Sequence, residues 1–301
     1  MKGIIYASIA NSIWGILPLY WAQFQGVSFK FILASRMILS FILGVFIIRK
    51  KLPVWIQCFK NKDFLKYTIF CSVMIMLNWA SYIYAMVNQK IIESSLGYFI
   101  QPLLVILMGM IFLKEPLNRF QNIAVFIVFL SLGMVTYFEG LPLLSIVLAS
   151  TFAMYSYLKK IYYRKIDQNK DSKNLEELPH FDTFYFVVAE SLWMLPFAIG
   201  VLIWLGTTQE PIQASYMQLT LLLFSGAVTL FPIGVFAKAT QLLSLSSLGF
   251  LQFIGPISQF VIGYFVFKEP LIAHNLYGFI LIWIAVILSL IPSKKMAKKP
   301  A

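Results

Sequence analysis

The sequence predicts an all-α polytopic membrane protein with ten transmembrane helices, arranged as an inverted 5+5 repeat. Of its 301 residues, 60% are hydrophobic and only 12% are charged, whereas soluble domains carry about 25% charged residues. The apolar residues lie in long charge-free runs, and a helix needs about 20 of them to cross the hydrocarbon. Two separate segments also resemble each other. This composition excludes an ordinary soluble enzyme and a disordered chain.

The apolar runs define ten spans in chain order. Seven runs contain no Asp, Glu, Lys, Arg or His, and three more contain a single such residue, namely Arg36, Glu190 or His274. The shortest connection contains Glu139, Gly140 and Pro142, which are typical of a tight hairpin. The predicted helix cores are 4–24, 30–48, 66–87, 94–113, 120–138, 141–158, 182–205, 216–237, 246–267 and 274–291.

Basic residues orient these spans. Of the 24 Lys and Arg residues, 20 fall on the side of the N-terminus, three fall on the other side, and Arg36 lies within a span. Cytoplasmic loops carry such an excess, so both termini are predicted to be cytoplasmic. The same bias explains the net charge of +12, and we therefore expect no nucleic-acid partner. The polar stretch Lys159–His180 is predicted to be a cytoplasmic loop that links two halves.

The sequence lacks the usual signals of several other classes of protein. The first span is too long for the core of a signal peptide, which has about 7–15 residues. Cys58 and Cys71 form no CxxC motif and are expected to be reduced, and His180 and His274 stand far apart. No HExxH, GxSxG or GxxxxGK[ST] motif is present. We predict no catalytic residue, metal or cofactor; a membrane-embedded enzyme and a channel or scaffold are the alternatives.

An internal repeat supplies the architecture. Residues 85–97 align with residues 237–249, with identity at six of 13 positions. Pro102 precedes Glu115 by the same 13 residues that separate Pro256 from Glu269, and both glutamates lie in a Lys-Glu-Pro-Leu segment. Because each unit contains five spans, the second must cross the membrane upside down, a plan common among secondary transporters. The predicted repeats are 1–138 and 139–301. Glu115 and Glu269 are interpreted as helix-start residues beside the following prolines.

At these positions the chain resembles the EamA-type branch of the drug/metabolite transporter superfamily, and within it the RarD-like proteins associated with chloramphenicol sensitivity. The matching elements are 14–15, Arg36, 78–79, 93–102, 190–196 and 247–256. The resemblance implies a ten-helix transporter of small organic molecules. It implies no single substrate, since superfamily members carry amino acids, drugs, nucleotide-linked metabolites and sugars.

Polar and aromatic side chains repeat at helical spacing on several spans. Gln252 and Gln259 share one face of the ninth span with Gly249 and Pro256, and Gln101 lies on the corresponding face of the fourth. Such residues either line a cavity between the halves or join helices, which is their commoner function in membranes. The candidate substrate-binding residues are Trp14, Asn78, Trp79, Tyr82, Tyr98, Gln101, Tyr155, Trp193, Phe250, Gln252 and Gln259.

Candidate coupling and gating residues follow from charge and from the repeat. Arg36 and Glu190 lie within spans at equivalent repeat positions, where ionisable groups are costly. They could form an ion pair, Glu190 could take up a proton or another cation, or Arg36 could reach the headgroups. Pro102 and Pro256 either act as hinges or form static kinks. Gly97 and Gly249 complete this candidate set.

These observations predict a secondary transporter that exports small amphipathic or aromatic metabolites or drugs across the bacterial inner membrane. It would work by alternating access. The predicted partners are a small-molecule substrate, membrane lipid and a coupling proton or other ion.

Overall fold

The computed structural model describes residues 1–87, 91–139, 143–170, 183–268, 273–289 and residue 291. Some sequence predictions lie outside these residues. They are the second Lys-Glu-Pro-Leu segment from Glu269 onward, the end of the predicted linker from residue 171, and the lysines after residue 291.

The described residues form helices and no strands. The first half contains α1 (Lys2–Trp21), η1 (Ala22–Phe24), α2 (Phe29–Ile48), η2 (Arg49–Lys51), α3 (Leu52–Cys58), α4 (Lys62–Val87), α5 (Ile91–Phe112) and α6 (Arg119–Glu139). The second half contains α7 (Leu143–Lys170), α8 (Thr183–Thr208), α9 (Tyr216–Leu223), α10 (Ser225–Leu242), α11 (Leu245–Gln252), α12 (Ile254–Phe265) and α13 (Ala273–Ser289).

Length and surface chemistry identify an integral membrane protein. Six helical segments of the described chain are long and apolar enough to cross a membrane: Lys2–Phe24, Phe29–Cys58, Lys62–Ala85, Thr183–Thr208, Tyr216–Leu242 and Leu245–Phe265. Shorter apolar helices cover Gly97–Phe112, Arg119–Ser131 and Ile280–Ser289. Large apolar side chains such as Phe46, Phe126 and Ile203 are 60–62% exposed. So much exposed apolar surface requires lipid or another apolar partner.

The helices differ in detail from those predicted. The segment that begins at Lys159 was predicted to be a loop, but α7 continues as a helix to Lys170. The short helix α3 was not predicted. The predicted ninth span is interrupted at Phe253, between α11 and α12. Pro256 explains this interruption, because it has no N–H to donate to the carbonyl four residues earlier. Pro102, by contrast, lies inside the continuous helix α5.

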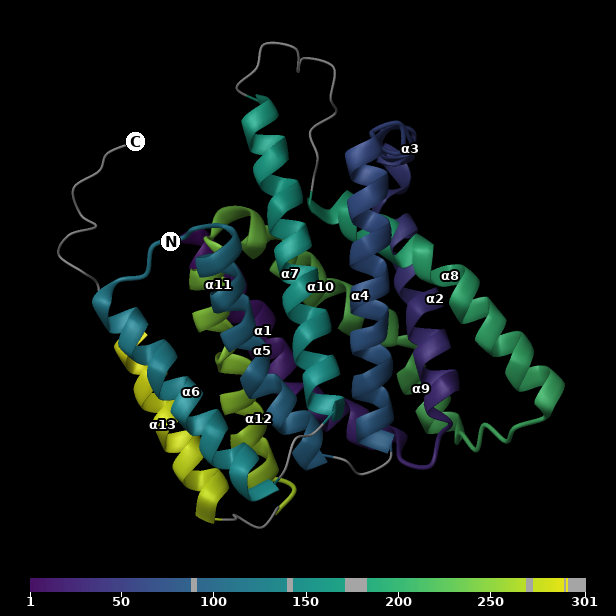
Figure 1. The fold of residues 1–301 in the computed structure, drawn as a ribbon. Helices are drawn as coiled ribbons and strands as arrows, with labels where there is room; N and C mark the ends of the chain where they lie inside the picture. Colours follow the sequence, from purple (N-terminus) through teal and green to yellow (C-terminus); the bar gives the residue numbers. More distant parts are fainter. Residues whose placement is uncertain (88–90, 140–142, 171–182, 269–272, 290, 292–301) are drawn as a thin grey trace.

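The two halves pack mainly against each other rather than within themselves. The main helix pairs across the halves are α1 with α10 and α12, α2 with α8 and α10, α4 with α7 and α8, α5 with α7 and α11, and α6 with α13. Figure 1 shows α6 beside α13 at one edge of the molecule and α8 along the opposite edge. Residues far apart in the chain therefore meet at the interface between the halves.

Glycine allows the closest of these approaches. A Cβ atom added to Gly226 of α10 would lie 2.6 Å from the backbone carbonyl carbon and oxygen of Leu39 in α2. At Gly15 of α1, the added Cβ would lie 2.4 Å from the Ser258 side chain of α12. Small residues let membrane helices approach closely, and their packing takes the place of the hydrophobic effect.

Gly226→Ala is therefore expected to separate α2 from α10 and to lower the Tm of the detergent-purified protein. The matched control is Gly200→Ala on α8, where an added Cβ meets nothing within 4 Å. Alanine at that site should be neutral or stabilise its helix by up to about 1 kcal/mol. Equal melting temperatures for the two variants would contradict the proposed close packing.

Candidate functional site

A narrow cavity lies between the two halves. Its walls come from α1, α2, α4 and α5 of the first half and from α7, α10, α11 and α12 of the second. Its empty space is about 680 Å³ when the open side is counted, but only about 60 Å³ is wide enough for the centre of a water molecule, so the cavity is constricted in this conformation. The lining residues are Asn11, Trp14, Leu17, Trp21, Arg36, Asn78, Trp79, Tyr82, Tyr98, Gln101, Phe152, Val228, Thr229, Ile233, Gln252, Gly255, Pro256 and Gln259.

Arg36 is the only charged residue among those that line this cavity in the described chain. Its side chain is 4% exposed, and its Nε atom donates a hydrogen bond of 3.2 Å to Thr229 of α10. The guanidinium carbon lies 4.7 Å from the ring centroid of Trp21 and 4.4 Å from that of Trp79. Arg36 therefore connects α2 to α1 and α4 through cation–π contacts, and to α10 of the other half through a hydrogen bond.

Carboxamide side chains supply the neutral polar groups of the cavity. Gln101 donates to Gln252 across the halves at 3.4 Å, and Gln259 donates to the Trp14 carbonyl at 3.3 Å. Asn78 donates to the Leu148 carbonyl of α7 at 2.9 Å. The Oε1 atom of Gln101 and the Nε2 atom of Gln252 are buried without a hydrogen-bond partner. The cavity thus offers one acceptor and one donor beside its aromatic walls.

The structure brings most of the predicted binding residues together. Trp14, Asn78, Trp79, Tyr82, Tyr98, Gln101, Gln252 and Gln259 line the cavity, as do Arg36 and Pro256 from the gating set. Their part in substrate binding stays a prediction. The sequence analysis missed Trp21 and Thr229, which both contact Arg36; neither residue stands out in the sequence.

Three predicted binding residues lie elsewhere. Tyr155 is fully buried beside Glu190. Trp193 donates to the hydroxyl of Thr68 at 3.0 Å and packs on Phe59. Phe250 belongs to a hydrophobic cluster with Phe99 and Ile106. Aromatic identity alone could not tell which face of the helix meets the cavity.

The remaining gating candidates lie at contacts between α5 and the second half. A Cβ atom added to Gly97 would lie 3.0 Å from the Ser145 backbone of α7. One added to Gly249 of α11 would lie 2.6 Å from Ile106 and 2.9 Å from the carbonyl oxygen of Pro102. These three candidates, Gly97, Gly249 and Pro102, therefore mark close helix packing next to the cavity.

Glu190 forms a buried ion pair, but with Lys159 rather than with Arg36. The Lys159 Nζ atom lies 3.0 Å from Glu190 Oε2, and the two side chains are 0% and 2% exposed. Lys159 also donates to the Tyr155 hydroxyl, which in turn donates to Glu190 at 3.2 Å. This corrects the assignment of Lys159 to a cytoplasmic loop. A fully buried lysine on α7 is thereby neutralised by a carboxylate on α8.

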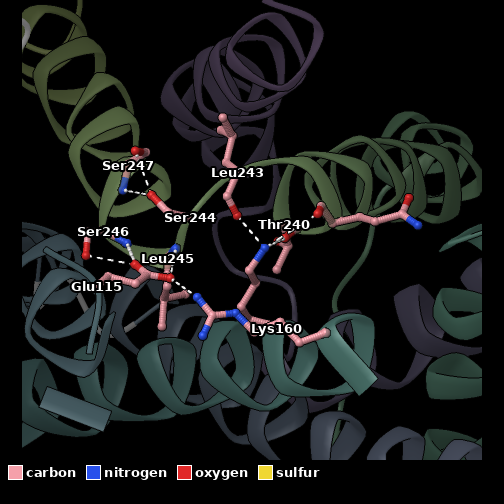
Figure 2. Close-up of polar contacts among 10 residues, drawn as sticks. Glu115, Lys160, Thr240, Leu243, Ser244, Leu245, Ser246 and Ser247 are labelled. Carbon is pink, nitrogen blue, oxygen red and sulfur yellow. Dashed lines mark hydrogen bonds and ion pairs between the residues drawn. The ribbon is translucent and has the colours of Figure 1, made fainter. Parts of the chain in front are cut away.

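Glu115 is also misassigned by sequence, because it caps a distant helix rather than the one that follows it. Its carboxylate accepts hydrogen bonds from the backbone N–H groups of Leu245 and Ser246, at 3.0 and 2.8 Å, at the start of α11. Arg164 of α7 lies 2.6 Å from the same carboxylate. Figure 2 shows Glu115 facing the first residues of α11. A negative charge there is favoured by the helix dipole.

Lys160 forms the complementary contact at the end of α10. Its ammonium donates to the carbonyl oxygens of Thr240 and Leu243, at 3.1 and 2.5 Å (Figure 2). A cation at a helix C-terminus is favoured for the same electrostatic reason. Together, Glu115, Lys160 and Arg164 hold α5, α7, α10 and α11 at one end of the molecule.

Known proteins resemble this chain along almost its whole length. The sequence profile of the EamA-like transporter family matches residues 1–137. The uncharacterized transporter YojE of Bacillus subtilis is 31% identical over 95% of this chain and 93% of its own. The protein RarD of Streptomyces exfoliatus is 31% identical over 95% and 87%. A crystal structure that is 13% identical, with a TM-score of 0.66 over 96% and 98% of the two chains, shares the fold.

The buried pair predicts a double-mutant result. Lys159→Met or Glu190→Gln alone should lower stability by about 3–5 kcal/mol or the equivalent in Tm, because each leaves a buried group without its partner. The double variant should melt closer to the wild type than either single variant does. Additive losses across this cycle would contradict the interaction.

The Glu115 contacts predict an unequal effect of two similar substitutions. Glu115→Gln should destabilise the protein by about 1–3 kcal/mol, since charge-assisted hydrogen bonds to a buried helix end are weakened. Glu210→Gln is the control, because Glu210 pairs with Lys30 at 2.8 Å while one third exposed. That change should cost less than about 1 kcal/mol. Thermal unfolding in detergent measures both, and a larger loss in the control would disprove the capping role.

Proposed function

The chain belongs to the EamA-like transporter family, and we propose that it exports small organic metabolites or drugs across the bacterial inner membrane as a secondary transporter. The observation that carries the proposal is the cavity that both halves line. A carrier needs a solute site whose two walls can separate on either side of the membrane. Residues from α1 and α4 line this cavity together with residues from α10, α11 and α12, so both halves contribute to the site.

The pattern of helix contacts supports an inverted repeat of residues 1–138 and 139–301. In the proposed correspondence, α1 matches α7, α2 matches α8, α4 matches α9–α10, α5 matches α11–α12, and α6 matches α13. Under this correspondence, the contact between α1 and α10 has its counterpart in the contact between α7 and α4. The contact between α1 and α12 likewise has its counterpart in the contact between α7 and α5. All four of these helix pairs are among the main contacts. Ten crossings with both termini in the cytoplasm follow from this arrangement and from the basic residues.

Alternating access requires the halves to part at one end while they close at the other. At one end, Glu115 accepts hydrogen bonds from the start of α11 and pairs with Arg164 of α7. At the other end, Gln218 of α9 donates to the carbonyls of Gln23 and Gln25, and Lys30 pairs with Glu210. We assign both sets of contacts to gates, and Pro102, Pro256, Gly97 and Gly249 to the helices that move between them.

Glu190 is the proposed coupling residue. It is buried, one of its carboxylate oxygens has no hydrogen-bond partner, and its partner Lys159 lies on a different helix. Movement of α7 relative to α8 would change this pair, and gain of a proton or another cation would stabilise the separated state. The ion pair thus offers a means of coupling solute movement to an ion gradient.

Reconstituted protein is expected to show saturable counterflow of a radiolabelled solute, and Glu190→Gln should abolish it while the variant still inserts in the membrane. Suitable solutes come from a thermal-shift panel, because a ligand that binds the native state raises its Tm. Asp63→Asn is the control for substitution itself, because Asp63 pairs with Lys165 at 3.0 Å while both side chains are 45% exposed. Ohmic current would favour a channel and product formation an enzyme. Normal flux by Glu190→Gln would contradict the coupling role.

A further inference from the structure

Arg36 has a bonding capacity that the protein does not use. A guanidinium has five N–H donors and a permanent positive charge. The Nε atom of Arg36 donates to Thr229, and two indole rings contact the guanidinium. Its Nη1 atom is buried and has no hydrogen-bond partner. The side chain is more than nine-tenths buried, so bulk water offers little compensation.

In the described part of the chain, no acidic side chain of the cavity lining balances this charge. Among the described residues that line the cavity there is no Asp or Glu, and Glu190 is already paired with Lys159. The buried charges in this region are therefore two cations, Arg36 and Lys159, against one carboxylate. An uncompensated cation in a poorly hydrated interior is costly unless an anion joins it.

Aromatic side chains line the same cavity as Arg36. Trp14 packs against Phe152, with ring centroids 5.4 Å apart, and Tyr82 packs against Tyr98 at 5.7 Å. Gln101 and Gln252, which line the same cavity, leave one acceptor and one donor unused. The lining thus combines a cation, aromatic surfaces and a neutral amide pair.

We propose that Arg36 is the carboxylate-binding residue of this cavity and that the solute is a small aromatic monocarboxylate. The planar fork of a guanidinium matches a carboxylate bidentately. A single negative charge neutralises the single unpaired cation, and the solute ring lies against the aromatic walls. This inference rests on the proposed transport function and names the solute class for it.

The competing explanation is that Arg36 only joins neighbouring helices and binds no solute. Its contacts with Thr229, Trp21 and Trp79 connect helices, and cation–π contacts stabilise by about 0.5–2 kcal/mol each. A residue with only that function would affect stability but would give the cavity no preference for anions. Charge discrimination between solutes of equal shape separates the two explanations.

The test is equilibrium binding to the purified full-length protein in nanodiscs. Three matched pairs serve as probes: benzoate and benzamide, phenylacetate and phenylacetamide, and 3-phenylpropionate and 3-phenylpropanamide. Wild-type protein should bind at least one carboxylate ten times or more tightly than its amide. Arg36→Gln should lose this preference and Arg36→Lys should keep part of it. Arg49→Gln, which changes an exposed arginine that donates to its own helix, should leave the preference intact.

Several results would overturn the assignment. Equal binding of acid and amide in all three pairs would do so, as would an anion preference that survives in Arg36→Gln. The wild-type comparison decides the matter even where Arg36→Gln fails to fold. Binding is measured without transport, so the two proposals can fail separately. Carboxylate binding without counterflow would contradict the transport proposal alone. Counterflow of neutral solutes without a preference for anions would contradict the solute class alone.

Discussion

A charged group in the hydrocarbon region of a membrane protein needs a counter-charge or polar partners within the protein, because the lipid tails supply neither. This constraint organises the interior of the chain. Lys159 and Glu190 satisfy each other between α7 and α8, and Glu115 and Arg164 do so beside the start of α11. Arg36 lines the cavity between the halves, where no Asp or Glu accompanies it among the described lining residues. The same constraint supports the proposal that an anionic solute binds Arg36.

The helices that hold these charges belong to different halves of the chain. Close contacts at Gly226 and Gly15 keep the halves together, and the cavity lies among helices of both halves. In the proposed gates, Glu115 and Arg164 join the halves at one end, and Gln218, Lys30 and Glu210 do so at the other. We propose that these polar contacts change when either end opens, while the close helix packing persists.

Apolar runs and helical spacing predicted much of this arrangement. Gln252 and Gln259 meet the cavity as expected, because residues seven apart lie on one face of a helix. The sequence could not reveal the Lys159–Glu190 pair. Lys159 begins a polar stretch that reads as a loop, and only the tertiary structure shows that its helix continues. The partners of Glu115 lie 49 residues away at Arg164 and 130 or 131 residues away at Leu245 and Ser246, so no local pattern connects them. Tyr155, Trp193 and Phe250 lie outside the cavity lining, and the sequence could not show this because an aromatic residue fits a core as well as a cavity.

Access to Gln252 from each side of the membrane tests the central claim most directly. The two native cysteines, Cys58 and Cys71, are buried, so a Gln252→Cys variant can be labelled against a low background. A membrane-impermeant thiol reagent would be applied to right-side-out and to inside-out vesicles. Alternating access predicts that the cysteine reacts from both sides. Reaction from one side alone would contradict a carrier in which two halves expose one site in turn.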